Sequence, residues 1–158
     1  MLSPEEIQAV EDGTRKEETP RSTCIAAMNF IQKQRGYVSD EALADLAPML
    51  GMSVSGLESV ATFYSLIFRK PVGEHVILLC DGASCWILGK DRVLDHLRQR
   101  LGIDLGQTTA DNQFTLLTIP CLGACDRAPA MMIDETLYGP LTPESVDEIL
   151  SNCESTDS

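Results

Sequence analysis

The sequence predicts an α+β protein with an N-terminal helical bundle over residues 1–70 and an α/β domain over residues 71–152. Two observations lead to this division. Apolar residues recur at helical spacing in the first part, whereas compact runs of strand-forming residues follow Pro71. The acidic, Ser/Thr-rich residues 153–158 predict a disordered tail. A chain of 158 residues is long enough to bury a core of this kind.

The first helix is predicted from its start signal. Ser3 stands before Pro4, and Glu6 follows at the third helical position, which is the pattern of a capping box with proline in the first turn. The polar run 11–21 predicts a solvated linker, so residues 1–20 are expected to be partly flexible.

Three further helices complete the predicted bundle. Each has a serine at its start and leucine, isoleucine or methionine residues spaced along one face, and two of them end at glycine. The predicted caps are Ser22 with a stop at Gly36, Ser39 with a stop at Gly51, and Ser55 paired with Glu58 in a capping box.

The second half alternates strand and helix patterns. Strand-like runs are followed by turn residues or by proline, and the helical runs have leucines at spacings of three and four. The predicted strands are 75–79, 114–119 and 131–133 with a turn towards 137–138, and the predicted helices are 88–101 and 142–150. This order favours a small α/β layer covered by helices.

Charge and composition restrict the partners. The formal charge of −12 disfavours nucleic acid and anionic lipid and favours a basic patch on a protein partner, although acidity also serves solubility. No run approaches the roughly 18–20 apolar residues of a membrane span, and the N-terminus lacks the features of a signal peptide. Membrane association is therefore expected only through partner subunits.

Two cysteine pairs are the main candidates for chemistry. Cys80 and Cys85 are separated by four residues, and Cys121 and Cys125 by three. In a reducing compartment, six cysteines indicate ligands rather than three disulfides. Each pair begins where a predicted strand ends, so both loops are expected at one end of a sheet.

The composition of both loops suits a [2Fe–2S] cluster, which needs two thiolates on each iron. The small residues Gly82, Ala83, Gly123 and Ala124 leave room for the bridging sulfides, and their backbone N–H groups can donate to sulfur. Because the oxidised cluster carries a net charge of −2, Arg127 is expected to offset part of it.

Other interpretations stay open at this stage. Structural zinc uses four thiolates too, usually at closer spacing, and would make the chain an interaction module without a redox role. Trp86 is expected either to shield the cluster or to pack in the core. The remaining candidates have structural interpretations: Cys24 as a core residue, Cys153 as an ordinary thiol of the tail, His75 and His96 as structural or surface residues, and Met131-Met132 as strand core.

Several segments resemble one known family. They are Gln32–Val38, Val60–Tyr64, the loop Cys80–Cys85, and the run Cys121–Ile133 with its Ala-Pro-Ala-Met-Met segment. These segments are similar to the small [2Fe–2S] subunit of respiratory NADH:quinone oxidoreductase (complex I). The resemblance covers roughly residues 20–150. Gly82 and Trp86 depart from it, since family members often have Ser and His at those positions.

The resemblance implies a thioredoxin-like ferredoxin fold after the helical bundle, with one [2Fe–2S] cluster on Cys80, Cys85, Cys121 and Cys125. It also implies a NuoF-like flavoprotein partner that binds NADH and FMN, other peripheral-arm subunits, and a cytoplasmic location at the inner membrane. The chain would belong to an NADH dehydrogenase without being catalytic alone. No Gly-rich phosphate loop is present in the sequence, so NADH and FMN are not expected to bind to this chain. Close relatives also serve NAD-linked hydrogenases and formate dehydrogenases.

Aromatic residues near the domain junction are candidate contacts for that partner. Phe63, Tyr64 and Phe68 are expected either to dock a partner or to pack in the core, with core packing slightly favoured.

Overall fold

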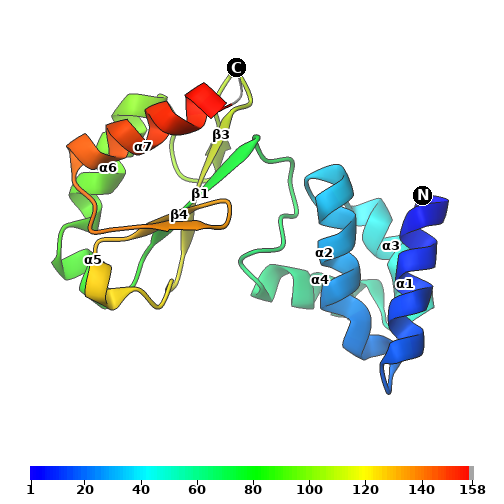
Figure 1. Ribbon diagram of the computed structural model, residues 1–158. Helices are drawn as coiled ribbons and strands as arrows, with labels where there is room; N and C mark the ends of the chain where they lie inside the picture. The colour runs from blue at the N-terminus through cyan, green and yellow to red at the C-terminus, as the bar shows by residue number, and fades with distance from the viewer. Residues whose placement is uncertain (157–158) are drawn as a thin grey trace. The chain divides into compact units, whose positions relative to one another are not determined.

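The computed structural model describes residues 1–156 and divides the chain into two compact units, Met1–Pro71 and Val72–Ser158 (Figure 1). The first unit contains helices, and the second contains a mixed five-stranded sheet with helices. The predicted α+β class is therefore confirmed.

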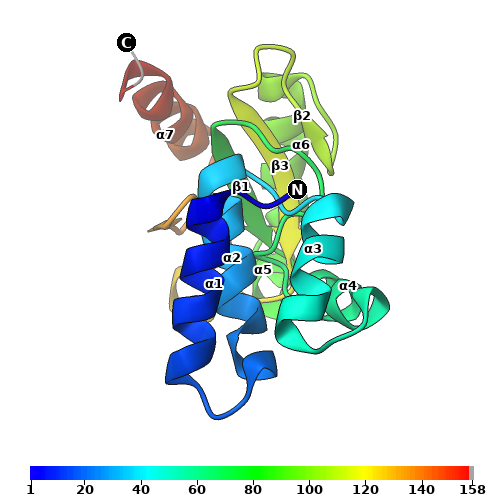
Figure 2. The same ribbon diagram turned by 90° about the vertical axis from the view of Figure 1, so that its right-hand side faces the viewer.

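Four α-helices and one short 3-10 turn form the first unit, in which α1 and α2 lie side by side (Figure 2). Their bounds are α1 Pro4–Lys16, η1 Pro20–Thr23, α2 Cys24–Arg35, α3 Asp40–Leu50 and α4 Val54–Phe63. One apolar residue at nearly every helical turn is buried, and these side chains form one core. Its largest members are Met28, Ile31, Leu43, Leu46, Leu50 and Leu57.

Most of the predicted helix boundaries are confirmed. Ser3 and Glu6 form the expected capping box, and the Ser39 hydroxyl accepts a hydrogen bond from the amide of Ala42. Gly36 and Gly51 end their helices in the left-handed conformation, which a residue without a Cβ adopts at little cost.

Three local predictions are wrong. Helix α1 continues to Lys16, through half of the predicted linker, because Gly13 packs closely against Thr23 of η1. Ser22 lies within η1, and α2 follows directly from that turn without a side-chain cap. Ser53, not Ser55, caps α4 by accepting from the Gly56 amide, and Glu58 instead binds Arg69.

A buried ion pair joins α1 to α2. The Arg35 guanidinium donates from Nε to one oxygen of Glu6 at 2.6 Å and from Nη2 to the other at 2.5 Å. Glu6 is only 2% exposed, and it also accepts from the Ser3 amide as part of the capping box. The hydrogen bond from Arg35 is the largest of the effects that hold the pKa of Glu6 below its ordinary value of 4.5.

The segment after α4 presents apolar side chains to solvent. The Gln32 side chain donates to the carbonyl of Leu66 and accepts from the amide of Phe68, so the segment is held against α2. Phe63 is nevertheless 79% exposed, and Tyr64 and Leu66 are also exposed, whereas Phe68 is half-buried. Core packing, the slightly favoured expectation for these aromatics, is therefore wrong for Phe63 and Tyr64.

The second unit is built on a sheet with strand order β2-β3-β1-β4-β5. Only the central β1–β3 pair is parallel, and the other neighbours are antiparallel. The bounds are β1 His75–Cys80, β2 Gln107–Thr108, β3 Phe114–Ile119, β4 Met131–Ile133 and β5 Thr136–Tyr138. All three predicted strands are present, and the short edge strand β2 was not predicted.

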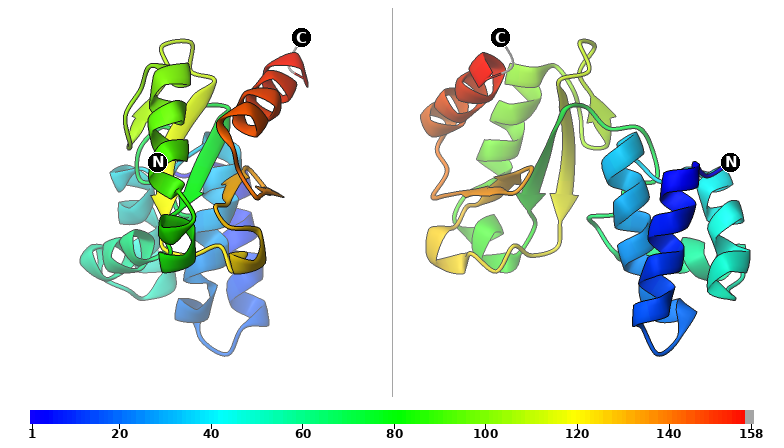
Figure 3. Two further views of the ribbon diagram at one scale, coloured as in Figure 1. Left: turned by 90° about the vertical axis from the view of Figure 1, so that its left-hand side faces the viewer. Right: turned by 45° about the vertical axis from the view of Figure 1, so that its right-hand side comes forward.

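Three helices complete this unit: α5 Ala83–Ile87, α6 Lys90–Leu101 and α7 Pro143–Thr156. Helices α6 and α7 lie side by side on one face of the sheet (Figure 3), where His96 contacts Asp147 at 2.9 Å. The helix predicted over 88–101 starts only at Lys90, because Gly89 takes a φ of 103° and separates α5 from α6.

The predicted disordered tail is wrong in its first part. Helix α7 continues through residues 153–156, and Cys153 packs against the core of the second unit, which extends the helix beyond Leu150. Residues 157–158 of the predicted tail lie outside the described residues.

Within residues 1–156, no helix combines the length and the apolar character that a transmembrane span requires.

We predict that Glu6→Gln lowers the free energy of unfolding by about 1–3 kcal/mol at neutral pH, because a charged hydrogen-bonded pair is lost. The difference between wild type and variant should shrink as the pH falls. The folded-state pKa of Glu6 lies below 4.5, so its stabilising effect is complete above pH 4.5 and disappears as the pH falls through the lower folded value.

Urea unfolding followed by far-UV circular dichroism from neutral pH downward measures both effects. Glu5→Gln is the matched control, since Glu5 is exposed on the same helical turn. A constant difference between wild type and Glu6→Gln at every pH would contradict the assignment.

Candidate iron–sulfur site

Parallel pairing of β1 with β3 brings the two cysteine loops together. Cys80 is the last residue of β1 and lies opposite Ile119, the last residue of β3, in the register of the sheet. Cys121 follows Ile119 by two residues. Strand β4 is antiparallel to β1 and begins at the same end, with Met131 opposite Leu79. The expectation that both loops meet at one end of a sheet is therefore confirmed.

The two cysteine pairs differ in exposure. Cys80 and Cys85 are 3% and 2% exposed, and they form a small buried cluster with Ala124, Ala128 and Ala130. Cys121 and Cys125 are exposed. The site therefore has a buried half on the 80–85 loop and an accessible half on the 121–125 loop.

Contacts between sulfurs and amides join the loops. Burial disfavours the thiolate of Cys80, but the backbone N–H groups of Gly82 and Leu122 and the thiols of Cys85 and Cys121 favour it more strongly, so its pKa is lowered. Burial, together with the neighbouring Cys80 and Cys125, raises the pKa of Cys85. Donors from both loops thus converge on Cys80.

The second loop has a backbone shape suited to a sulfur ligand. Gly123 takes a φ of 70°, and its N–H donates to Cys121 Sγ at 3.3 Å. The turn that follows, η2 Cys125–Arg127, is closed by the Arg127 amide donating to Ala124. Gly139 lies so close to this turn that a Cβ there would overlap the Arg127 carbonyl oxygen. The end of β5 therefore supports the loop.

The donor set fits a [2Fe–2S] cluster. Four thiols come from two loops, and those of Cys80, Cys85 and Cys121 lie beside backbone amides that point at sulfur, as cluster sulfurs require. Zinc is also held by four thiolates, so the metal content of the purified protein decides between the two interpretations.

Cysteines and histidines outside the two loops have structural surroundings. Cys24 is buried in the core of the first unit, as predicted. His75 binds Asp134 at 2.8 Å and packs against the Phe114 ring, and His96 binds Asp147. Cys153, expected in a polar tail, instead lies partly buried on helix α7.

Two residues beside the loops differ from expectation. Trp86 is 61% exposed, so of its two expected roles core packing is wrong; with Ile87 and Leu88, it forms an exposed apolar stretch directly after Cys85. Arg127 is exposed too, and its guanidinium faces Asp126 at 3.6 Å, so its charge is partly matched by a neighbour.

Sequence reasoning missed Lys90. Its ammonium binds the Asp81 carboxylate at 2.6 Å, and Asp81 directly follows Cys80. The hydrogen bond to Asp81 is the main cause of the raised pKa of Lys90. A lysine in the first turn of the predicted helix 88–101 opposes the helix dipole, and this was the signal that the sequence offered.

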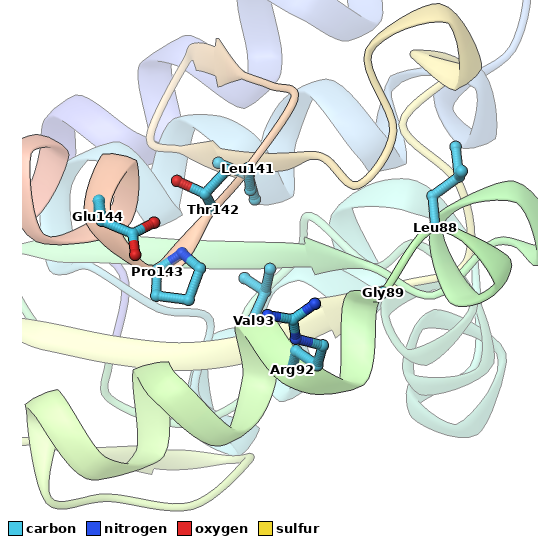
Figure 4. Close-up of a pocket in the computed structure, with 8 residues that line it drawn as sticks. All are labelled: Leu88, Gly89, Arg92, Val93, Leu141, Thr142, Pro143 and Glu144. Carbon is cyan, nitrogen blue, oxygen red and sulfur yellow. The ribbon is translucent and has the colours of Figure 1, made fainter.

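A shallow pocket lies between the start of α6 and the start of α7 (Figure 4). Arg92 and Glu144 line it together with apolar side chains such as Val93 and Leu141. None of the four paired cysteines contributes to its lining, so this pocket is separate from the candidate iron–sulfur site.

Comparison with known proteins agrees with this geometry. Residues 10–154 match the family described as thioredoxin-like [2Fe–2S] ferredoxin. The E subunit of NADH-quinone oxidoreductase from Pseudomonas aeruginosa is 47% identical over 150 residues, covering 95% of this chain and 90% of the relative. The protein of the same name from Escherichia coli is 48% identical over 149 residues, covering 94% and 90%.

A solved structure shares the fold. An NAD⁺-reducing [NiFe]-hydrogenase in the air-oxidised state superposes with a TM-score of 0.70 at 24% identity, over 85% of this chain and 23% of the hydrogenase chain. At that identity the likeness concerns the fold alone. The family match and the relatives at nearly half identity together carry the assignment. The chain belongs to the thioredoxin-like [2Fe–2S] ferredoxin family, in the branch that contains these NADH-quinone oxidoreductase subunits.

Proposed function

We propose that the chain is an electron-transfer subunit of an NADH:quinone oxidoreductase. In this proposal Cys80, Cys85, Cys121 and Cys125 hold one [2Fe–2S] cluster, which exchanges single electrons with FMN in a NuoF-like partner that binds NADH. The observation that carries the proposal is the meeting of two cysteine loops at the ends of paired parallel strands. The family membership and the names of the relatives support it.

The protein's own residues bind and tune the cluster in this proposal. A bound [2Fe–2S] cluster accepts and returns one electron at a time. Cys80 and Cys85 would hold one side of it away from water, while amides of both loops donate to sulfur and stabilise its negative charge. The exposed Cys121 and Cys125 would leave the other side accessible to a redox partner.

Exposed apolar residues support the existence of a protein partner. Phe63 ends α4, and Tyr64 and Leu66 follow it; the Phe63 and Tyr64 rings pack edge to face with centroids 5.3 Å apart. Arg69 holds this segment by donating to Glu58, Asp40 and the carbonyl of Val38. A fixed aromatic surface is typical of protein interfaces.

The proposal also includes the cellular location of the chain and assigns NADH oxidation to the partner. NADH oxidation would take place on the partner protein, so the chain alone is not catalytic. Other subunits of the peripheral arm would hold it on the cytoplasmic side of the inner membrane. The relatives' names favour this complex over an NAD-linked hydrogenase or a formate dehydrogenase.

We predict that Cys121→Ala and Cys125→Ala each abolish the visible absorption of the purified chain, because an iron that loses one thiolate is no longer held by the loop. Wild type should contain about two iron and two sulfide per chain and no stoichiometric zinc. Absorption spectra with iron, zinc and sulfide analysis measure this result.

Cys153→Ala and Cys24→Ala are the controls, since neither cysteine lies in the two loops. Both should retain the wild-type spectrum. Loss of colour in Cys153→Ala would show that the ligand assignment is wrong, and a colourless wild type with one zinc per chain would favour the interaction-module alternative.

We further predict that Phe63→Ser reduces co-purification of the NADH- and FMN-binding partner several-fold when both proteins are expressed together. The exposed Phe63 ring contributes little to the fold, so the visible spectrum and the thermal stability should not change. Flavin absorbance of the captured complex measures the effect.

Val54→Ser is the matched control, because Val54 is also exposed and apolar but lies at the other end of α4. Equal capture by wild type and Phe63→Ser would place the partner contact elsewhere.

A further inference from the structure

The ion pair between Lys90 and Asp81 has no role in holding a ligand, yet it lies at the buried half of the site. Lys90 Nζ binds Asp81 Oδ1 at 2.6 Å and Asp91 Oδ1 at 3.2 Å. Lys90 is 9% exposed, one of only four buried polar or charged residues among those described. A lysine this buried is uncommon unless it is paired.

The fold places the Lys90 ammonium beside the loop between Cys80 and Cys85. Gly89, at the junction of α5 and α6 (Figure 4), takes a left-handed φ and turns the chain so that Lys90 begins α6. Asp81 is fixed from the other side, because its amide donates to the carbonyl of Ile119 at the end of β3. The ion pair thus joins the start of α6 to the loop between Cys80 and Cys85.

Helix stability does not explain Lys90. A cation in the first turn opposes the helix dipole, and burial of an ammonium is costly. The buried position of Lys90 is explained by its ion pair with Asp81, the residue that directly follows Cys80. An unpaired carboxylate there would repel the net −2 charge of an oxidised cluster and would repel the reduced cluster more, since reduction adds one negative charge.

We infer that Lys90 is a positioning and tuning residue, which neutralises Asp81 beside the cluster and so raises the reduction potential of the cluster. The inference rests on the proposed function, because it requires a cluster on the 80–85 loop. Lys90 acts through Asp81 and is not a ligand.

The test is a charge cycle on the full chain, with the midpoint potential measured by redox titration and the reduced cluster followed by electron paramagnetic resonance. Lys90→Met should shift the potential to a more negative value, because Asp81 is left unpaired. Asp81→Asn should shift it to a more positive value, because the cation is left unpaired. The double variant should lie close to wild type.

Two further variants separate charge from structure. Lys90→Arg keeps the cation and should retain the wild-type potential. Arg98→Met removes a paired cation near the other end of α6, where Arg98 binds Asp104 at 2.8 Å, and should leave the potential unchanged. A purely structural role for the ion pair would move both single variants in the same direction or move neither, and either result would overturn the inference.

The outcomes are distinct from those of the proposed function. If wild type binds no [2Fe–2S] cluster, the proposed function fails. If wild type binds the cluster but Asp81→Asn does not shift the potential upward, only the role of the ion pair fails. If Lys90→Met assembles no cluster, the midpoint potential of Asp81→Asn still tests the role of the ion pair, since this variant retains the lysine and alters only one carboxylate.

Discussion

The in-register parallel pairing of β1 and β3 is the constraint on which the site depends. Because Cys80 lies opposite Ile119, the loops that leave these strands start side by side, although about forty residues separate them in the chain. A parallel pair requires a crossover, and α5 and α6 provide it. The crossover that connects these two strands therefore also brings Lys90 back to the loop that begins at Cys80.

The two cysteine loops at the ends of β1 and β3 have different environments. The 80–85 loop is buried among alanines; amide and thiol donors lower the pKa of Cys80 despite this burial, whereas the pKa of Cys85 is raised. The 121–125 loop is exposed and owes its shape to Gly123 and to the close approach of Gly139. In the proposed function, a cluster held between these loops would have one insulated side and one accessible side, as suits a carrier that receives electrons from outside the chain.

The N-terminal unit has its own core and its own exposed surface. Its core of leucine, isoleucine and methionine is complete within Met1–Pro71, and the buried Glu6–Arg35 pair joins its first two helices. Gln32 and Arg69 then hold the chain after α4 so that Phe63 remains in solvent. Several partly buried or exposed polar contacts support an exposed aromatic surface, and this arrangement is better explained by a partner than by the unit's own stability.

Local sequence determined the elements and the chemistry. Capping serines and stop glycines predicted most helix ends, strand-forming runs predicted β1, β3 and β4, and loop composition indicated the four cysteines, because each of these signals acts over a few residues. Tertiary structure alone decided what depends on distant packing. The close packing of Gly13 on Thr23 extends α1, Ser53 replaces Ser55 as a cap, Cys153 prolongs α7, and Trp86 stays exposed. The Lys90–Asp81 contact belongs to this second class, since a φ of 103° at Gly89 and the sheet register together determine it.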